Sequence, residues 1–143
     1  MQTELVEETN DETLAAGATV FTVEDARDLV QLFAKVTSSK NVDDFLNGFT
    51  DDCIVRYGEF PEMRGKEVFR PFVEQMFSDR LKNFRCEKSL RSLSGNVIGG
   101  TWESTWTDAE SGKKRAGRGF EFWIMRDRQI ARWDAGFNFW TVK

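Results

Sequence analysis

The chain has 143 residues and a mass of 16.5 kDa, which fits one domain with its own hydrophobic core. Its net charge of −4 and isoelectric point near 5.0 argue against a protein that binds nucleic acid by neutralising phosphates. No apolar run approaches the roughly 18–20 residues that span a bilayer, and the N-terminus lacks the pattern of a signal peptide. We therefore expect no nucleic-acid partner and no membrane partner.

The residue types present limit the available chemistry. The sequence contains no histidine, which is the usual general base near neutral pH and the commonest zinc ligand. Cys53 and Cys86 have no paired spacing and no metal motif, which is typical of reduced thiols in a cytoplasmic protein. We expect no metal and no cofactor. The thirteen phenylalanines and five tryptophans suit either an aromatic-lined cavity or simply a bulky core.

The first ordered element is predicted just after residue 20. Residues 1–20 are acidic and then rich in Ala, Gly and Thr, which predicts a flexible N-terminal tail before a domain of residues 21–143. Thr22 is a hydroxyl N-cap three residues before a carboxylate, and apolar residues then repeat at helical spacing as far as Val36. We expect this first helix to end within residues 37–40.

A short second helix and a first strand follow. Asn41 is a suitable N-cap for a helix from Val42 to Asn47. Asp51 and Asp52 could be metal ligands in isolation, but adjacent aspartates before a strand favour a turn. The sequence Cys-Ile-Val-Arg-Tyr at residues 53–57 then predicts a strand.

The third predicted helix contains a proline. After a loop at residues 58–65, a thick apolar stripe runs at helical spacing from Val68 to Phe77. Pro71 lies inside this pattern, so the helix either starts late or carries a kink. The sequence leaves both alternatives open.

The remainder of the chain has the period of strands. Aromatic and β-branched residues dominate four segments, which are separated by Ser94-Gly95, a polar loop at residues 108–114 and a turn near Asp127. Strands joined this way form an antiparallel meander. The sequence thus predicts an α+β fold, with three N-terminal helices and a strongly curved, mostly antiparallel sheet. The four strands are expected at residues 84–93, 96–107, 115–126 and 130–140.

Three stretches resemble the nuclear transport factor 2-like superfamily, in its SnoaL-like branch. They are residues 49–57, residues 64–69 and the closing hairpin with Ile-Ala-Arg-Trp at 130–133. The resemblance spans about residues 21–140 and implies a cone-shaped, cystatin-like roll, in which the sheet curls around a pocket that the helices close. The superfamily hosts isomerases, dehydratases, epoxide hydrolases, polyketide cyclases and non-catalytic binding domains, so it implies a fold more than an activity.

Several catalytic patterns of the superfamily do not carry over. The catalytic carboxylate of ketosteroid isomerases falls on Tyr57, and their first-helix tyrosine falls on Phe33. The residues used by limonene epoxide hydrolases fall on Trp102, Ser104 and Ala135. Scytalone dehydratases and hexachlorocyclohexane dehydrochlorinase need a histidine, which is absent. We expect none of these particular mechanisms.

The resemblance implies which side chains point into the pocket. Glu121 is the predicted general acid or base, in surroundings that favour its neutral form, and Tyr57 would donate a hydrogen bond to a carbonyl or enolate oxygen. A register shifted by one residue would bring in Asp134 as the catalytic carboxylate, with Arg132 and Asn138. A further alternative is that Glu121 faces outward or pairs with an arginine. The predicted substrate-binding residues are Phe33, Val55, Phe72, Met76, Trp102, Ser104, Trp123, Trp133 and Phe137.

Two functions stay open at this point. One is a cofactor-independent isomerase, dehydratase or cyclase acting on a small, hydrophobic, oxygenated compound. The other is a non-catalytic ligand-binding or dimerisation module of the same fold. The resemblance also implies a homodimer formed through the outer face of the sheet, which would carry Glu103, Arg118, Arg132, Asp134 and Asn138.

Overall fold

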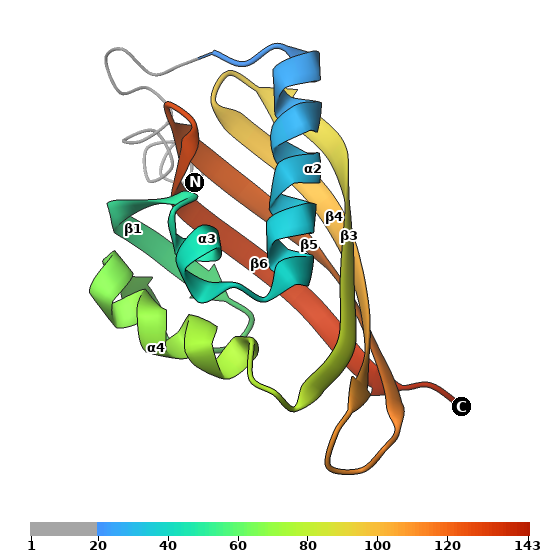
Figure 1. Cartoon of the computed structure of the whole chain (residues 1–143). Helices are drawn as coiled ribbons and strands as arrows, with labels where there is room; N and C mark the ends of the chain where they lie inside the picture. The colour runs from blue at the N-terminus through green and yellow to red at the C-terminus, as the bar shows by residue number, and fades with distance from the viewer. Residues whose placement is uncertain (1–19) are drawn as a thin grey trace, which may run out of the picture.

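A layer of helices covers one face of a curved sheet (Figure 1). The computed structural model describes residues 20–143, and the predicted N-terminal tail lies outside them apart from Val20. Within residues 20–143 there are three helices and six strands. The predicted α+β fold with a mostly antiparallel, curved sheet is confirmed.

The first two helices begin where the sequence predicts. Helix α2 spans Val23–Ser39 and helix α3 spans Val42–Leu46. The Thr22 hydroxyl accepts a hydrogen bond from the backbone N–H of Asp25 at 3.1 Å. The Asn41 side chain caps α3 in the same way, at 2.9 Å. Each cap satisfies a backbone donor that has no partner within the helix.

Helix α4 spans Lys66–Met76 and follows the first two strands of the chain. Pro71 lies inside this helix, so the alternative of a late start is wrong. No described helix is long and apolar enough to cross a membrane.

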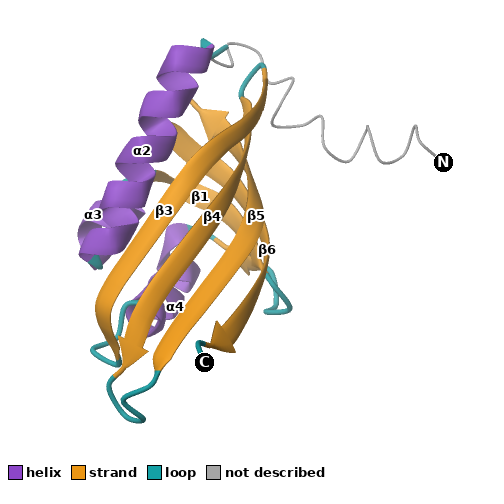
Figure 2. Ribbon diagram, turned by 90° about the vertical axis from the view of Figure 1, so that its right-hand side faces the viewer, coloured by secondary structure: helices purple, strands orange, loops and turns teal. Residues whose placement is uncertain are grey.

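The sheet places the first long strand beside the last one. Strands β3 to β6 form the predicted antiparallel meander, whereas β1 pairs with β6 in parallel (Figure 2). The short strand β2, inside the predicted loop at residues 58–65, was not predicted. The order across the sheet is β2-β1-β6-β5-β4-β3. The strands are β1 Phe49–Tyr57, β2 Met63–Arg64, β3 Leu81–Ser94, β4 Val97–Asp108, β5 Lys114–Arg126 and β6 Gln129–Thr141.

Strand β1 starts earlier than the sequence predicts, at Phe49. Asp51 and Asp52 lie within it, where its register against β6 is irregular, and both are exposed. Lys66 lies 3.5 Å from Asp51, and Arg126 lies 2.9 Å from Asp52. The prediction of a turn is wrong here because an irregularity in a strand can direct adjacent side chains to solvent without ending the strand.

The register of β5 and β6 decides which side chains face the helices. Trp123 lies opposite Trp133, and Phe122 lies opposite the next residue of β6. Glu121, Trp123 and Trp133 are buried, whereas Phe120 and Phe122 on the other face are 71% and 54% exposed. The alternative register, which would turn the Asp134 side of β6 inward, is therefore wrong.

The core lies between the helices and this inner face. Phe49 is fully buried, and its ring contacts Phe45, Phe69 and Trp133 at centroid separations of 5.2, 5.0 and 6.0 Å. These rings come from α3, α4, β1 and β6. They pack α3 and α4 against β1 and β6.

Candidate functional site

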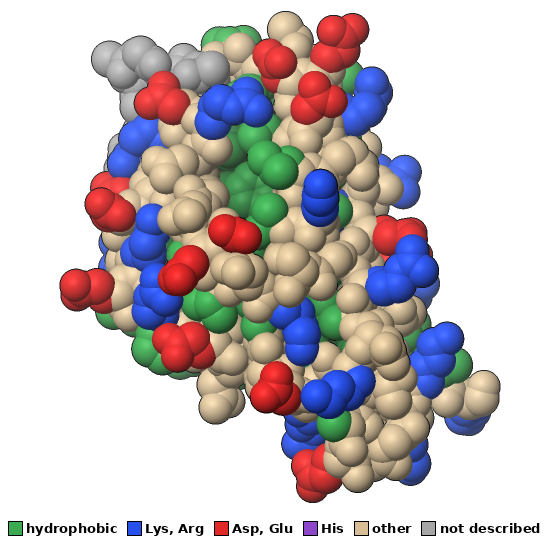
Figure 3. All heavy atoms as spheres, viewed as in Figure 1, with side chains coloured by type: hydrophobic (Ala, Val, Ile, Leu, Met, Phe, Trp, Pro, Cys, Tyr) green, Lys and Arg blue, Asp and Glu red, His purple; other side chains and the backbone are tan. Residues whose placement is uncertain are grey.

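A cavity of about 570 Å³ lies between α4 and the inner face of the sheet. Known small-molecule sites occupy roughly 300–1,000 Å³. The walls come from all three helices and from β1, β3, β4 and β6, and most of their surface is apolar. On the face that the helices cover, apolar side chains remain visible between charged ones (Figure 3). Its lining residues include Tyr57, Phe72, Met76, Lys88, Trp102 and Ser104.

The cavity is aromatic at its mouth and carries its charge deep inside. Phe60 and Phe139, which line it, are 51% and 43% exposed. Trp102 is buried, and the side chain of Lys88 is only 7% exposed. A ligand that enters must therefore lose most of its water before it meets the ammonium group.

Strands β3 and β4 build the polar wall from two neighbouring cross-strand pairs. Lys88 lies opposite Trp102, and Cys86 lies opposite Ser104. These residues share one face because side chains two apart in a strand point the same way. Gly119 of β5 leaves room for the large ring, since a Cβ at that position would come within 2.8 Å of Trp102. The wall thus combines an ammonium, an indole, a thiol and a hydroxyl.

A buried ion pair joins Lys88 to Glu121. The ammonium lies 2.8 Å from Oε2 of the carboxylate, and the two side chains are 7% and 3% exposed. The other oxygen, Oε1, accepts hydrogen bonds from the indole N–H groups of Trp123 at 2.9 Å and Trp133 at 3.0 Å. Both oxygens of Glu121 thus face donors, which is the arrangement that an ionised carboxylate requires.

Lys88, and not Glu121, forms part of the cavity surface. Lys88 lines the cavity, whereas Glu121 lies behind it. Its ammonium also lies 6.0 Å and 5.7 Å from the ring centroids of Trp102 and Trp123. An ammonium has three N–H donors, and Glu121 is the one hydrogen-bond acceptor that Nζ meets among residues 20–143. Two N–H groups of Lys88 are thus without an acceptor among the described residues.

Uncharged polar groups complete the cavity. Burial raises the pKa of Tyr57 well above its ordinary value of 10.0, and the nearby Cys86 and Glu121 add to this effect. Burial likewise raises the pKa of the Cys86 thiol above 9.0. Trp102 lines the cavity, and its buried Nε1 has no hydrogen-bond partner within the described part of the chain. The phenol and the thiol remain protonated near neutral pH.

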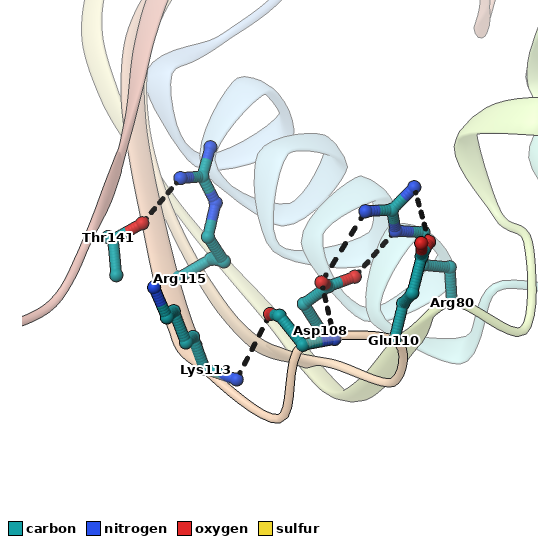
Figure 4. A network of polar contacts seen from close by, with 7 residues as sticks. Arg80, Asp108, Glu110, Lys113, Arg115 and Thr141 are labelled. Atoms are coloured by element: carbon teal, nitrogen blue, oxygen red, sulfur yellow. Dashed lines mark hydrogen bonds and ion pairs between the residues drawn. The ribbon is translucent and has the colours of Figure 1, made fainter.

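A second polar network lies beside the cavity (Figure 4). Arg80 binds Asp108 at 2.6 Å and Glu110 at 3.1 Å, and the backbone N–H of Ser111 donates to Asp108 at 3.0 Å. Hydrogen bonds from Arg80 and Ser111 hold the pKa of Asp108 well below its ordinary value of 3.8. The network fixes the loop between β4 and β5 next to Trp106, which lines the cavity.

The family follows from a comparison of the sequence with known domains. The SnoaL-like domain matches residues 29–133, which is most of the chain. The protein belongs to the SnoaL-like family. Its curved sheet and its helical layer agree with the cone of the nuclear transport factor 2-like superfamily, to which SnoaL-like domains belong.

Solved structures with the same fold include two candidate polyketide cyclases. The one from Xanthomonas campestris pv. campestris is 21% identical, with a TM-score of 0.63 over 79% of this SnoaL-like chain and 90% of its own. The one from Pseudomonas putida KT2440 is 19% identical, with a TM-score of 0.61 over 79% and 91%. No curated protein gives a significant match. At these identities the similarity shows the fold alone.

The cavity of this SnoaL-like domain brings together part of the predicted site. Among the predicted residues, those that line it are Tyr57, Phe72, Met76, Trp102, Ser104 and Trp133. Those that belong to the core, or pack against it away from the cavity surface, are Phe33, Val55, Trp123 and Phe137. The reason is visible at Phe33, where α2 covers the sheet and the ring packs on Trp123 with centroids 4.8 Å apart.

Asp134 does not reach the cavity. It lies on the outer face of β6, where Arg132 donates a hydrogen bond to it at 3.0 Å. Within residues 20–143, no group of three or more cysteine and acidic side chains is placed to hold a metal ion.

Sequence reasoning missed Lys88. A signal was present, because Phe84, Cys86, Lys88 and Leu90 alternate with more polar residues along β3. That alternation places the lysine on the same face as the apolar residues.

Proposed function

We propose that this SnoaL-like domain is a cofactor-independent isomerase, dehydratase or cyclase that acts on a small, hydrophobic, oxygenated compound. The observation that supports this most is the ion pair of Lys88 and Glu121, deep in an apolar cavity. Removing two charges from water costs several kcal/mol per ion. The burial of such a pair therefore indicates a functional role. Charged groups in a dry, concave site are common where proton transfer is catalysed.

The pair can act as one acid–base unit with Tyr57. The carbonyl oxygen of a substrate would accept a hydrogen bond from the Tyr57 hydroxyl. Transfer of a proton from Lys88 to Glu121 would leave a neutral amine, which removes a proton from the carbon next to the carbonyl. The resulting ammonium and the phenol then stabilise the enolate oxygen. Return of the proton to a different carbon completes an isomerisation. For a cyclisation, the enolate carbon attacks a second carbonyl, whose π bond breaks, and the resulting alkoxide takes the proton from the ammonium of Lys88.

Exchange of substrate protons for deuterium tests this proposal without knowledge of the natural substrate. A panel of hydrophobic ketones is incubated in heavy water, and loss of the proton signal next to the carbonyl is followed by NMR. We expect exchange with the unchanged protein and a loss of about 10²–10⁴-fold in Lys88→Met. We expect a smaller loss in Tyr57→Phe, because the ammonium of Lys88 remains.

Glu87→Gln is the matched control. Glu87 is the neighbour of Lys88 on β3, but its side chain is 76% exposed. It should leave the exchange rate unchanged. Equal rates in Lys88→Met and in the unchanged protein would exclude the catalytic role.

The outer face of the sheet supports a second function, as a dimerisation module. Phe120 and Phe122 are 71% and 54% exposed there, and Arg118 lies over the ring of Trp140 at 5.7 Å. Exposed aromatic residues on one sheet face are typical of protein interfaces. We propose that a homodimer forms through this face. Sedimentation velocity should show a dimer for the unchanged protein and a monomer for Phe122→Glu; a monomer in both cases would contradict it.

The state of the cysteines supports a reducing compartment. Cys53 and Cys86 are both buried free thiols. Free thiols persist in the cytoplasm, where disulfides are rare. We propose that the protein works there, on a small hydrophobic ligand.

A further inference from the structure

The positive charge of Lys88 in the cavity is balanced by a neighbouring carboxylate. Among its described lining residues, Lys88 is the one with a charged side chain. The carboxylate of Glu121 lies 2.8 Å from the ammonium on the side away from the cavity. The site therefore offers strong hydrogen-bond donors but almost no net charge.

This balance disfavours an anionic ligand. A carboxylate that enters must lose its water, because the surrounding wall is mostly aromatic and buried. The attraction from Lys88 would offset that cost only in part, since Glu121 lies just behind it and repels a second negative charge. The electrostatic gain that normally accompanies an ion pair is thus largely missing.

An uncharged carbonyl oxygen meets no such penalty. It can accept hydrogen bonds from the two donors of Lys88 that Glu121 does not use. Tyr57, which lines the same cavity, adds a phenol that stays protonated. The donors suit an oxygen with two lone pairs, and the aromatic mouth suits a flat, apolar body.

We propose that the cavity selects uncharged, planar carbonyl compounds over the corresponding carboxylates, and that Glu121 sets this selectivity by cancelling the charge on Lys88. This inference rests on the proposed function in one respect, that a small molecule enters the cavity. It assigns the ammonium of Lys88, before any proton leaves it, as a second donor to the carbonyl oxygen that Tyr57 also binds. It assigns Glu121 as a specificity-determining residue that need not touch the ligand.

Two probes of matched shape test the selectivity. The methyl ketone of naphthalene and the carboxylate of naphthalene share a planar body and differ in the charge of the head group. Binding is measured near neutral pH by quenching of tryptophan fluorescence and by calorimetry. The unchanged protein should bind the ketone at least about tenfold more tightly, a difference of about 1.4 kcal/mol.

Glu121→Gln should reverse this preference. The amide oxygen of the new side chain can still accept from Trp123 and Trp133, while the negative charge behind Lys88 is gone. The carboxylate probe should gain about tenfold in affinity, with little change for the ketone. Lys88→Met retains Glu121 and should increase the preference for the ketone, with carboxylate binding falling below detection.

The two variants remove opposite charges, so they must move the ratio of ketone affinity to carboxylate affinity in opposite directions. The inference therefore stays testable if one of them fails to fold. Equal binding of both probes by the unchanged protein would overturn the inference while leaving a small-molecule function intact. If the ratio of ketone affinity to carboxylate affinity is unaltered in the folded variants, the inference is likewise overturned and a small-molecule function remains. Failure of the unchanged protein to bind either probe would overturn the inference and the proposed function together.

Discussion

Trp123 and Trp133 lie opposite each other on β5 and β6 and direct their indole N–H groups at the same oxygen of Glu121. Neither ring can rotate freely, since both are buried and Trp123 packs against Phe33. The carboxylate is therefore held by the sheet itself, and the position of Lys88 follows from it. A group fixed in this way needs no rearrangement when a ligand arrives.

The ion pair should show strong coupling in stability measurements. Lys88→Met and Glu121→Gln each leave one member of the pair unmatched, so each should lower the free energy of unfolding by about 3–5 kcal/mol. The double variant should be more stable than the sum of the two losses predicts, by about 1 kcal/mol or more. Urea unfolding of the four proteins measures this. Additive losses would mean that the two groups do not interact in the folded state.

Gly119 should tolerate no side chain. A Cβ there would contact the backbone oxygen of Gly136 and come within 2.8 Å of Trp102. Gly119→Ala should therefore lose about 1–3 kcal/mol through overpacking. Gly136→Ala is the matched control, because its Cβ would meet no atom within 4 Å. Thermal unfolding compares the two variants, and an equal effect of both would refute the steric explanation.

Tyr57 gives a clean alkaline titration because it is the only tyrosine in the sequence. Burial raises its pKa above the ordinary value of 10.0, so the folded state keeps its proton where the unfolded chain loses it. Its contribution to stability is complete below pH 10.0 and declines as the pH rises beyond that value. The ultraviolet absorbance of phenolate should stay flat through this range in the folded protein and rise in denaturant. A rise at the ordinary pKa in the folded protein would contradict its burial.

Asp108 should stabilise the protein at neutral pH and lose that effect in acid. Its pKa is held below 3.8, so the unfolded chain takes up a proton before the folded protein does. The stabilisation is complete well above pH 3.8 and declines as the pH falls below it. Asp108→Asn should accordingly be less stable than the unchanged protein near neutral pH, and the gap should narrow below pH 3.8. A gap that is the same at every pH would point to packing instead of charge.

The sheet was the most predictable part of the molecule. The family resemblance implied that Glu121, Trp123 and Trp133 lie on the inner face, alternation along residues 115–140 was consistent with this, and the observed burial agrees. Helix caps at Thr22 and Asn41 were equally clear, because they are local signals. Such features depend on residues within a few positions of one another.

The part of the site that escaped prediction depends on distant contacts. A lysine normally extends to water, and the burial of Lys88 makes sense only beside Glu121, 33 residues further along the chain. The division of inward-facing residues into core and cavity depends on where α2 and α4 cover the sheet. Val55 and Tyr57 lie two residues apart on the same face of β1, yet of these two only Tyr57 lines the cavity. No local pattern carries that information.

The parallel pairing of β1 with β6 has a consequence for how the chain reaches its folded state. β1 pairs with only two other strands, and one of them, β2, has just two residues. On the ribosome, β1 thus remains without its main neighbour until residues 130–135 of β6 have emerged. Contacts between such distant segments slow folding. The aromatic residues of α3, α4 and β1 that pack on Trp133 can therefore complete their packing only after β6 is available.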